Sequence, residues 1–178
     1  MFKRPGNPQL EEFAKSYTDR TCSLGAIDLV IREDGTKGCV WCGDPLKSKH
    51  HATRYCKDGL CPDSFMAWAY PQQEYGLNYL LIRQNFCCNI CGYDWKPIIE
   101  NVVGPRYRNF GIEYYKTKPN PMLMKRLKRH CEKKFKPEVD HIVPIYKGGT
   151  SIGLDNHQAI CYTCHKAKTS KDLSGKRK

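Results

Sequence analysis

Two neighbouring stretches decide the fold of this chain: Glu138-Val139-Asp140-His141-Ile142-Val143-Pro144 and Cys161-Tyr162-Thr163-Cys164-His165-Lys166. The pair Gly148-Gly149 and then Asn156 lie between them. We predict a strand over 138–143, a loop at the glycine pair, a returning strand over 156–161 and a helix over 162–173. This order predicts a small α+β core built as strand, loop, strand and helix.

The side chains of this core suit hydrolysis of a phosphodiester bond. That reaction needs a base for the attacking water, neutralisation of the charge on phosphorus and help for the departing oxygen. A neutral imidazole best fits the first task near neutral pH, and a divalent cation supplies the other two. Because successive strand residues point to opposite faces, Asp140 and His141 are expected to have separate roles. We predict Asp140 and His165 as ligands of the cation and His141 as the general base.

The cysteines indicate zinc rather than disulfide bonds. The chain has eleven, an odd number, and three pairs have the form Cys-x-x-Cys. Cys39/Cys42 and Cys88/Cys91 are each followed by glycine, as in a zinc knuckle. In a reducing compartment this spacing is typical of metal ligands. We therefore predict two structural zinc ions.

The cost of closing a loop rises with its length, which favours pairing cysteines that lie near each other in the sequence. On this basis we divide the cysteines between two sites. The predicted sites are Cys39, Cys42, Cys56 and Cys61, and then Cys88, Cys91, Cys161 and Cys164. His50 or His51 is an alternative to one cysteine of the first site. The second site spans a gap of 69 residues, which structural zinc, worth about 10–16 kcal/mol in small fingers, can close. Cys22 has no near partner, and we expect a plain buried or free thiol.

The charge of the chain points to a polyanionic partner. The net charge is +12, and residues 105–136 alone contain eleven lysines and arginines against two glutamates. A helix is predicted over 121–134, with Met122, Leu123, Leu127 and Cys131 facing inwards. A solvated face is the alternative for such a run, but its place directly before the acid–base cluster favours phosphate contact. The predicted DNA contacts are Lys125, Arg126, Lys128, Arg129, Lys133, Lys134 and Lys168.

The rest of the chain is predicted to form smaller elements. These are helices over 8–17, 63–70 and 74–84 and a strand over 26–32 that ends in a turn at Asp34-Gly35. We divide the chain into an N-terminal segment (1–38), a four-cysteine zinc-finger module (39–75) and a nuclease domain (76–178) with a basic insertion (93–137). No segment has the apolar length of a membrane span, and the N-terminus does not resemble a secretory signal. We therefore expect an intracellular protein, cytoplasmic or nuclear, that is not secreted.

Several motifs in combination resemble the HNH endonuclease family. They are Asp140-His141-Ile142-Val143-Pro144, Gly148-Gly149, Asn156-x-Gln158 and Cys161-x-x-Cys164-His165-x-x-Lys168-Thr169. The spacing His141-x14-Asn156-x8-His165 agrees with that family, and the resemblance covers roughly residues 76–173. The segment 39–61 is similar to the four-cysteine finger that precedes the HNH module in some longer proteins.

The resemblance implies a ββα-metal fold with one catalytic divalent ion, Mg²⁺ or Mn²⁺. It implies that His141 is the general base, that Asp140 and His165 hold the ion and that Asn156 holds the loop that orients His141. It also implies that the cysteines of the second site hold a structural zinc. His157 departs from the family, in which an aliphatic residue is usual. We expect His157 to face solvent, with a phosphate contact as the alternative.

Three functions are compatible with these features. The first is a metal-dependent endonuclease that hydrolyses double-stranded or branched DNA. The second is a zinc-stabilised DNA- or RNA-binding protein without catalysis, which would have no use for Asp140, His141 and His165 together. The third is an adaptor that docks a larger complex, or forms a homodimer, through residues 1–75. The first uses more of the observed residues than the others.

Overall fold

The computed structural model describes residues 6–7, 10, 30–46, 54–56, 60–102 and 120–175. Its elements, in chain order, are β1 (Val30–Ile31), β2 (Lys37–Gly38), α2 (Leu60–Ala69), α3 (Glu74–Arg83), α4 (Lys96–Val102), α6 (Pro121–His130), η3 (Lys133–Phe135), β3 (Pro137–His141), η4 (Ile145–Lys147), β4 (His157–Cys161) and α7 (Tyr162–Gly175). The mixed helix and strand content confirms the α+β class. No helix of the described ranges is both long and apolar enough to cross a bilayer.

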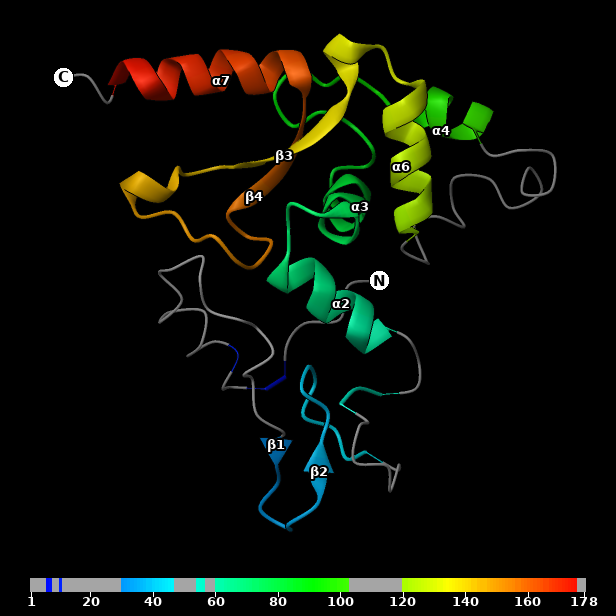
Figure 1. The fold of residues 1–178 in the computed structure, drawn as a ribbon, viewed down its shortest axis with the longest axis vertical. Helices are drawn as coiled ribbons and strands as arrows, with labels where there is room; N and C mark the ends of the chain where they lie inside the picture. The colour runs from blue at the N-terminus through cyan, green and yellow to red at the C-terminus, as the bar shows by residue number, and fades with distance from the viewer. Residues whose placement is uncertain are drawn as a thin grey trace.

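The centre of the fold is the antiparallel pair β3 and β4 with α7 directly after it (Figure 1). In its register Asp140 lies opposite Gln158, and His141 lies opposite His157. The connection between the strands contains Gly148, whose φ of +87° ends η4 in the left-handed region that suits glycine. The predicted order of strand, loop, strand and helix is confirmed, although β3 ends at His141, two residues before the predicted end.

The outer edge of β4 is covered by side chains from the end of α3. Arg83 donates to the carbonyl oxygens of Leu154 (2.9 Å) and His157 (2.6 Å). The Gln84 amide bonds both backbone groups of Ala159, accepting from its N–H and donating to its carbonyl, each at 2.7 Å. These bonds take the place of a third strand, because an unpaired sheet edge needs partners for its backbone. They also fix α3 between β4 and α6, as Figure 1 shows.

The basic helix α6 is shorter than predicted. It ends at His130, Cys131 forms its C-cap, and a separate 3-10 turn (η3) follows. At its start the Asn120 side chain accepts from Leu123 N at 3.1 Å, and Pro121 occupies the first turn. Met122 was expected to face inwards, but it is 59% exposed, whereas Met124 is fully buried. The inward stripe therefore follows Leu123, Met124 and Leu127.

The described residues before α3 pack around a second, smaller core, which Ile152 also joins. The tight turn at Asp34-Gly35 joins β1 and β2 as predicted, although the described part of the first strand is only Val30–Ile31. The α2 helix begins at Leu60, so Cys61 lies inside its first turn rather than before the helix. Trp41 and Trp68 pack edge to face, with ring centroids 6.0 Å apart. Aromatic rings and cysteines thus supply most of this core.

Several predictions fall on parts of the chain that the structure does not describe. They concern the helix over 8–17 apart from Leu10, Cys22, the alternative ligands His50 and His51, and residues 103–119 of the basic insertion. The division of the chain at residues 38 and 75 also stays a prediction.

Candidate active site

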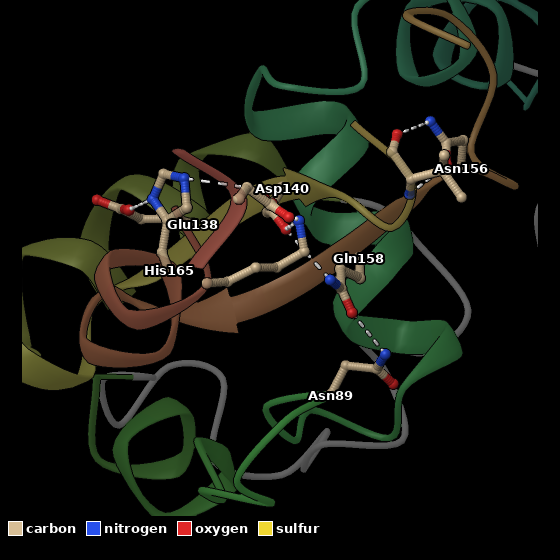
Figure 2. Close-up of polar contacts among 9 residues, drawn as sticks. Asn89, Glu138, Asp140, Asn156, Gln158 and His165 are labelled. Carbon is tan, nitrogen blue, oxygen red and sulfur yellow. Dashed lines mark hydrogen bonds and ion pairs between the residues drawn. The ribbon is translucent and has the colours of Figure 1, made fainter. Parts of the chain in front are cut away.

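One face of β3 brings two carboxylates to the start of α7. Glu138 and Asp140 are two residues apart on the strand, so their side chains point the same way. His165 lies between them: its Nδ1 is 2.5 Å from Glu138 Oε2, and its Nε2 is 3.7 Å from Asp140 Oδ1 (Figure 2). Asp140 and His165 therefore present one oxygen and one nitrogen to the same space. This pair suits a divalent cation, because carboxylate oxygen and imidazole nitrogen are common ligands for such ions.

Glu138 is a residue of this site that the sequence reasoning missed. A carboxylate that receives the second ring N–H of a metal-binding histidine fixes the tautomer and the direction of the ring. Here Glu138 bonds Nδ1 of His165 and leaves Nε2 directed at Asp140. The alternation of side chains along the predicted strand could have found it, since it places Glu138 beside Asp140.

The second oxygen of Asp140 has two partners. Oδ2 lies 3.1 Å from Lys168 Nζ and accepts from Gln158 Nε2 at 3.2 Å. Lys168 also bonds Asp172 at 3.0 Å. Burial alone would lower the pKa of Lys168, but the bonds to Asp172 and Asp140 outweigh it and raise the pKa. Lys168, predicted to contact DNA, is thus a charged ammonium held at the candidate metal site.

His141 lies against a second imidazole. The ring centroids of His141 and His157 are 4.5 Å apart with the ring planes tilted by 48°. His157 is fully buried, so the expectation that it faces solvent is wrong. Every residue of β4 is buried, so the whole strand lies inside the structure. In the strand register His157 lies opposite His141, and paired residues of neighbouring strands share one face. Burial, followed by the charge of His141, lowers the pKa of His157 to about 4.

The low pKa of His157 predicts a measurable dependence of stability on pH. A group with a pKa of about 4 when folded and 6.5 when unfolded takes up its proton preferentially in the unfolded state, so stability falls as the pH drops through this interval. The loss is on the order of 3 kcal/mol by pH 4. His157→Leu should lack this part of the loss. Urea unfolding of both proteins between pH 4 and pH 7 measures the difference, and parallel curves would contradict a neutral, buried His157.

Asn156 fastens the segment that follows His141. Its Oδ1 accepts from Val143 N at 2.8 Å, and its Nδ2 donates to the carbonyl oxygens of Val143 (2.9 Å) and Thr150 (3.0 Å). A Cβ atom on Gly149 would clash with the Val143 carbonyl oxygen and lie 2.6 Å from Asn156 Nδ2. The close approach of Gly149 therefore lets one amide side chain bond both sides of the loop. This is the geometry that the proposed loop-holding role of Asn156 needs.

A groove gives access to these groups. It has a volume of about 510 Å³ and is lined by Gln72, Asp140, His141, Pro144, Ile145, Tyr146, Ser151, Lys168 and Asp172. The metal-ligand candidate Asp140 and the base candidate His141 thus open on the same space although their side chains leave the strand on opposite faces. The end of β3 at His141 makes this possible, because strict alternation stops where the strand stops.

The cysteines form two clusters that fit zinc sites. One contains Cys39, Cys42, Cys56 and Cys61, the other Cys88, Cys91, Cys161 and Cys164, and in each the sulfurs lie within 4.8 Å of one another. Four sulfurs about 2.3 Å from a tetrahedral zinc are about 3.8 Å apart. The Cys61–Cys42 and Cys91–Cys161 sulfurs are separated by 3.7 and 3.8 Å. The grouping is the one that loop closure predicts, with Cys164 in the second cluster and its neighbour His165 beside Asp140.

The chemistry of the thiols agrees with this fit. Burial raises the pKa of Cys61 and of Cys164 above the usual range of a thiol. For Cys39 and Cys88 burial also acts to raise the pKa, but hydrogen bonds from backbone groups outweigh it and lower the pKa. A zinc ion at each cluster would bind the four sulfurs as thiolates.

The predicted DNA contacts lie in two places. On α6 and η3, Lys125, Arg126, Arg129, Lys133 and Lys134 are exposed and Lys128 is half-buried. Lys134 lies 3.2 Å from Glu132, an exposed pair of little energetic weight. Lys168 is separate from this group and lines the groove. Their role in DNA binding stays a prediction.

Comparison with known proteins agrees with the geometry of the site. Residues 129–171 match the family model described as HNH endonuclease. The Mus musculus protein named DNA annealing helicase and endonuclease ZRANB3 is 27% identical over 159 aligned residues, which cover 83% of this chain and 14% of that protein. Its Homo sapiens counterpart is 24% identical over 181 residues, covering 96% of this chain and 16% of that protein. No solved structure gives a significant match.

This chain thus spans about one-sixth or less of the length of these two relatives. The matched residues include β3, β4 and most of α7. They carry Asp140, His141, Asn156 and His165 in the arrangement described above. Together, the family match and the ββα geometry identify residues 129–171 as an HNH endonuclease domain.

Proposed function

We propose that this chain is a metal-dependent DNA endonuclease. The observation that carries the proposal is the convergence of Asp140 Oδ1 and His165 Nε2, 3.7 Å apart, beside a groove that His141 also lines. Phosphodiester hydrolysis requires a cation site and a base that share access to the substrate, and here Asp140 of the cation-binding pair and the His141 imidazole line one groove. A protein that only binds nucleic acid has no use for this combination.

Each residue has a distinct task in the proposed reaction. Asp140 and His165 would hold one divalent ion, Mg²⁺ or Mn²⁺, which supplies charge neutralisation at the phosphate and the leaving oxygen. His141 takes the proton of the attacking water. Asn156 holds residues 143–150 against the end of β3, and so keeps the backbone beside His141 in place. Glu138 keeps the ring of His165 turned towards Asp140.

The substrate we propose is double-stranded or branched DNA. The net charge of +12 and the exposed lysines and arginines of α6 and η3 support a polyanionic partner. Both relatives are named as endonucleases and as DNA annealing helicases. The present chain matches only a small part of them, and the proposal concerns DNA cleavage alone.

A cleavage assay tests the function. Supercoiled plasmid should be nicked or linearised in the presence of Mg²⁺ or Mn²⁺, and an excess of EDTA should stop the reaction. Asp140→Asn should reduce the rate at least tenfold, because a neutral amide is a much weaker cation ligand than a carboxylate. Asp34→Asn is the matched control, since Asp34 lies in the exposed turn between β1 and β2. Equal cleavage by all three proteins, or cleavage that survives EDTA, would contradict the proposal.

A further inference from the structure

A row of side-chain amides connects the second cysteine cluster with the candidate metal ligand Asp140. Asn89 lies between Cys88 and Cys91, and its Nδ2 donates to Gln158 Oε1 at 2.7 Å. Gln158 Nε2 in turn donates to Asp140 Oδ2 at 3.2 Å. Figure 2 shows the three side chains in line, reaching from the knuckle across β4 to β3.

The carboxylate of Asp140, at one end of the row, determines which group donates in each of these hydrogen bonds. An ionised carboxylate only accepts hydrogen bonds. The Gln158 amide must therefore turn its NH₂ group towards Asp140 and its oxygen towards Asn89. Asn89 must then donate. The identity of residue 89 thus determines which end of the Gln158 amide faces Asp140.

The row is also firmly anchored. Gln158 is only 5% exposed, so water competes little for its bonds. The knuckle is tied to β4 by the bond from Asn89 N to the Ala159 carbonyl oxygen (3.1 Å) and by the bond from Cys161 N to Cys88 Sγ (3.3 Å). The position of Asn89 is therefore set by the cysteine cluster and by β4 together.

These hydrogen bonds determine the orientation of the Asp140 carboxylate. With Oδ2 held by Gln158 and Lys168, Oδ1 is the oxygen that faces His165 Nε2. We propose that Asn89 and Gln158 are positioning residues that orient the Asp140 carboxylate for the divalent ion, and so make the geometry of the catalytic site depend on the cysteine knuckle. This inference rests on the proposed function, because it assigns Asp140 to the metal.

Reversing the polarity of residue 89 tests the inference. In Asn89→Asp the new carboxylate accepts the Gln158 NH₂ group, which turns the Gln158 oxygen towards Asp140 and repels it. Mn²⁺ affinity should fall about 10- to 100-fold, the usual effect of a lost outer partner. The added negative charge by itself would attract the cation and strengthen binding. Weaker Mn²⁺ binding therefore indicates that the Gln158 amide has reversed, because the added charge alone has the opposite effect.

The measurement is titration of the zinc-loaded full chain with Mn²⁺, followed by the electron paramagnetic resonance signal of the free ion. Asn89→Ala removes the donor without reversing the amide and should lose less affinity than Asn89→Asp. Asn101→Asp, an exposed residue of α4, is the matched control for the charge change. Zinc content and the melting temperature of each variant show that the knuckle and the fold are retained.

The outcomes separate this inference from the proposed function. If the wild-type chain neither binds Mn²⁺ nor cleaves plasmid, the proposed function fails. If the wild type does both and Asn89→Asp binds Mn²⁺ as tightly as Asn101→Asp, the positioning role is overturned. If Asn89→Asp loses zinc, the variant Gln158→Leu decides, because it leaves residue 89 unchanged. The inference predicts that Gln158→Leu keeps its zinc and still binds Mn²⁺ more weakly, and unchanged affinity overturns it.

Discussion

His141→Ala is expected to lower the rate of plasmid cleavage by about 10²–10⁴-fold, the usual contribution of a general base. The imidazole lines the groove next to Asp140, and among the groove-lining residues that the structure describes it is the only imidazole; the neighbouring His157 is fully buried. The metal-ligand candidates Asp140 and His165 are untouched by the change. Single-turnover cleavage at saturating Mg²⁺ measures the loss, and Mn²⁺ affinity should stay within about twofold of wild type because His141 is not a proposed ligand.

His130→Ala is the matched control for this variant. His130 is an exposed residue at the last turn of α6, outside the groove. The His130→Ala substitution removes the same kind of side chain as His141→Ala and leaves the proposed base in place. Full activity of His141→Ala would refute the assignment of the base. A large loss of Mn²⁺ affinity in that variant would instead move His141 to the ligands of the metal.

Loss of one sulfur from the second cysteine cluster should unfold the part of the chain built around β3, β4 and α7. Cys91→Ser is the sharpest variant, because Cys91 is exposed and its packing contributes little. A structural zinc site is worth about 10–16 kcal/mol in zinc-finger peptides, and the whole stability of a domain is about 5–15 kcal/mol. The cluster joins the loop after α3 to the end of β4 and the start of α7. We expect loss of one zinc equivalent and of cooperative thermal unfolding.

The chain contains its own control for this experiment. Cys87 lies one residue before the cluster and bonds the Asn85 carbonyl oxygen instead of facing the other sulfurs. Cys87→Ser should keep both zinc ions and the wild-type melting temperature within a few degrees. Metal analysis after dialysis and circular dichroism on heating give the two readouts. A stable Cys91→Ser protein with full zinc content would contradict the prediction that the Cys91 sulfur is needed to hold zinc and the fold.

Spacing in the sequence predicts the parts of this molecule that depend on neighbours along the chain. The Cys-x-x-Cys pairs and the cost of loop closure lead to the two clusters that the structure contains. The strand, loop, strand and helix order follows from Gly148-Gly149 and the residues on either side. The opposite directions in which the Asp140 and His141 side chains leave the strand follow from alternation in a strand.

Features that depend on packing and on contacts between distant parts of the chain could not be predicted in this way. His157 is buried along with the rest of β4 and lies opposite His141, and no pattern within its own strand reveals these neighbours. Gln158 meets Asn89 across 69 positions of sequence. The end of α6 at His130 depends on packing of Cys131 and on the turn η3, whereas helix propensity alone would have continued to Lys134.

The loop between β3 and β4 limits which segments of this protein could be exchanged for those of another protein by recombination. Ile152 of this loop belongs to the core around Trp41 and Trp68, and Gly153 N donates to the Trp68 carbonyl oxygen at 2.8 Å. A recombination event that joined residue 76 to a foreign finger would expose Ile152 and leave that N–H without its acceptor. The contacts of Ile152 and Gly153 therefore constrain such exchanges. An exchange that kept α2 would retain the Trp68 carbonyl oxygen, but it would separate Cys61 from the other three cysteines of the first cluster.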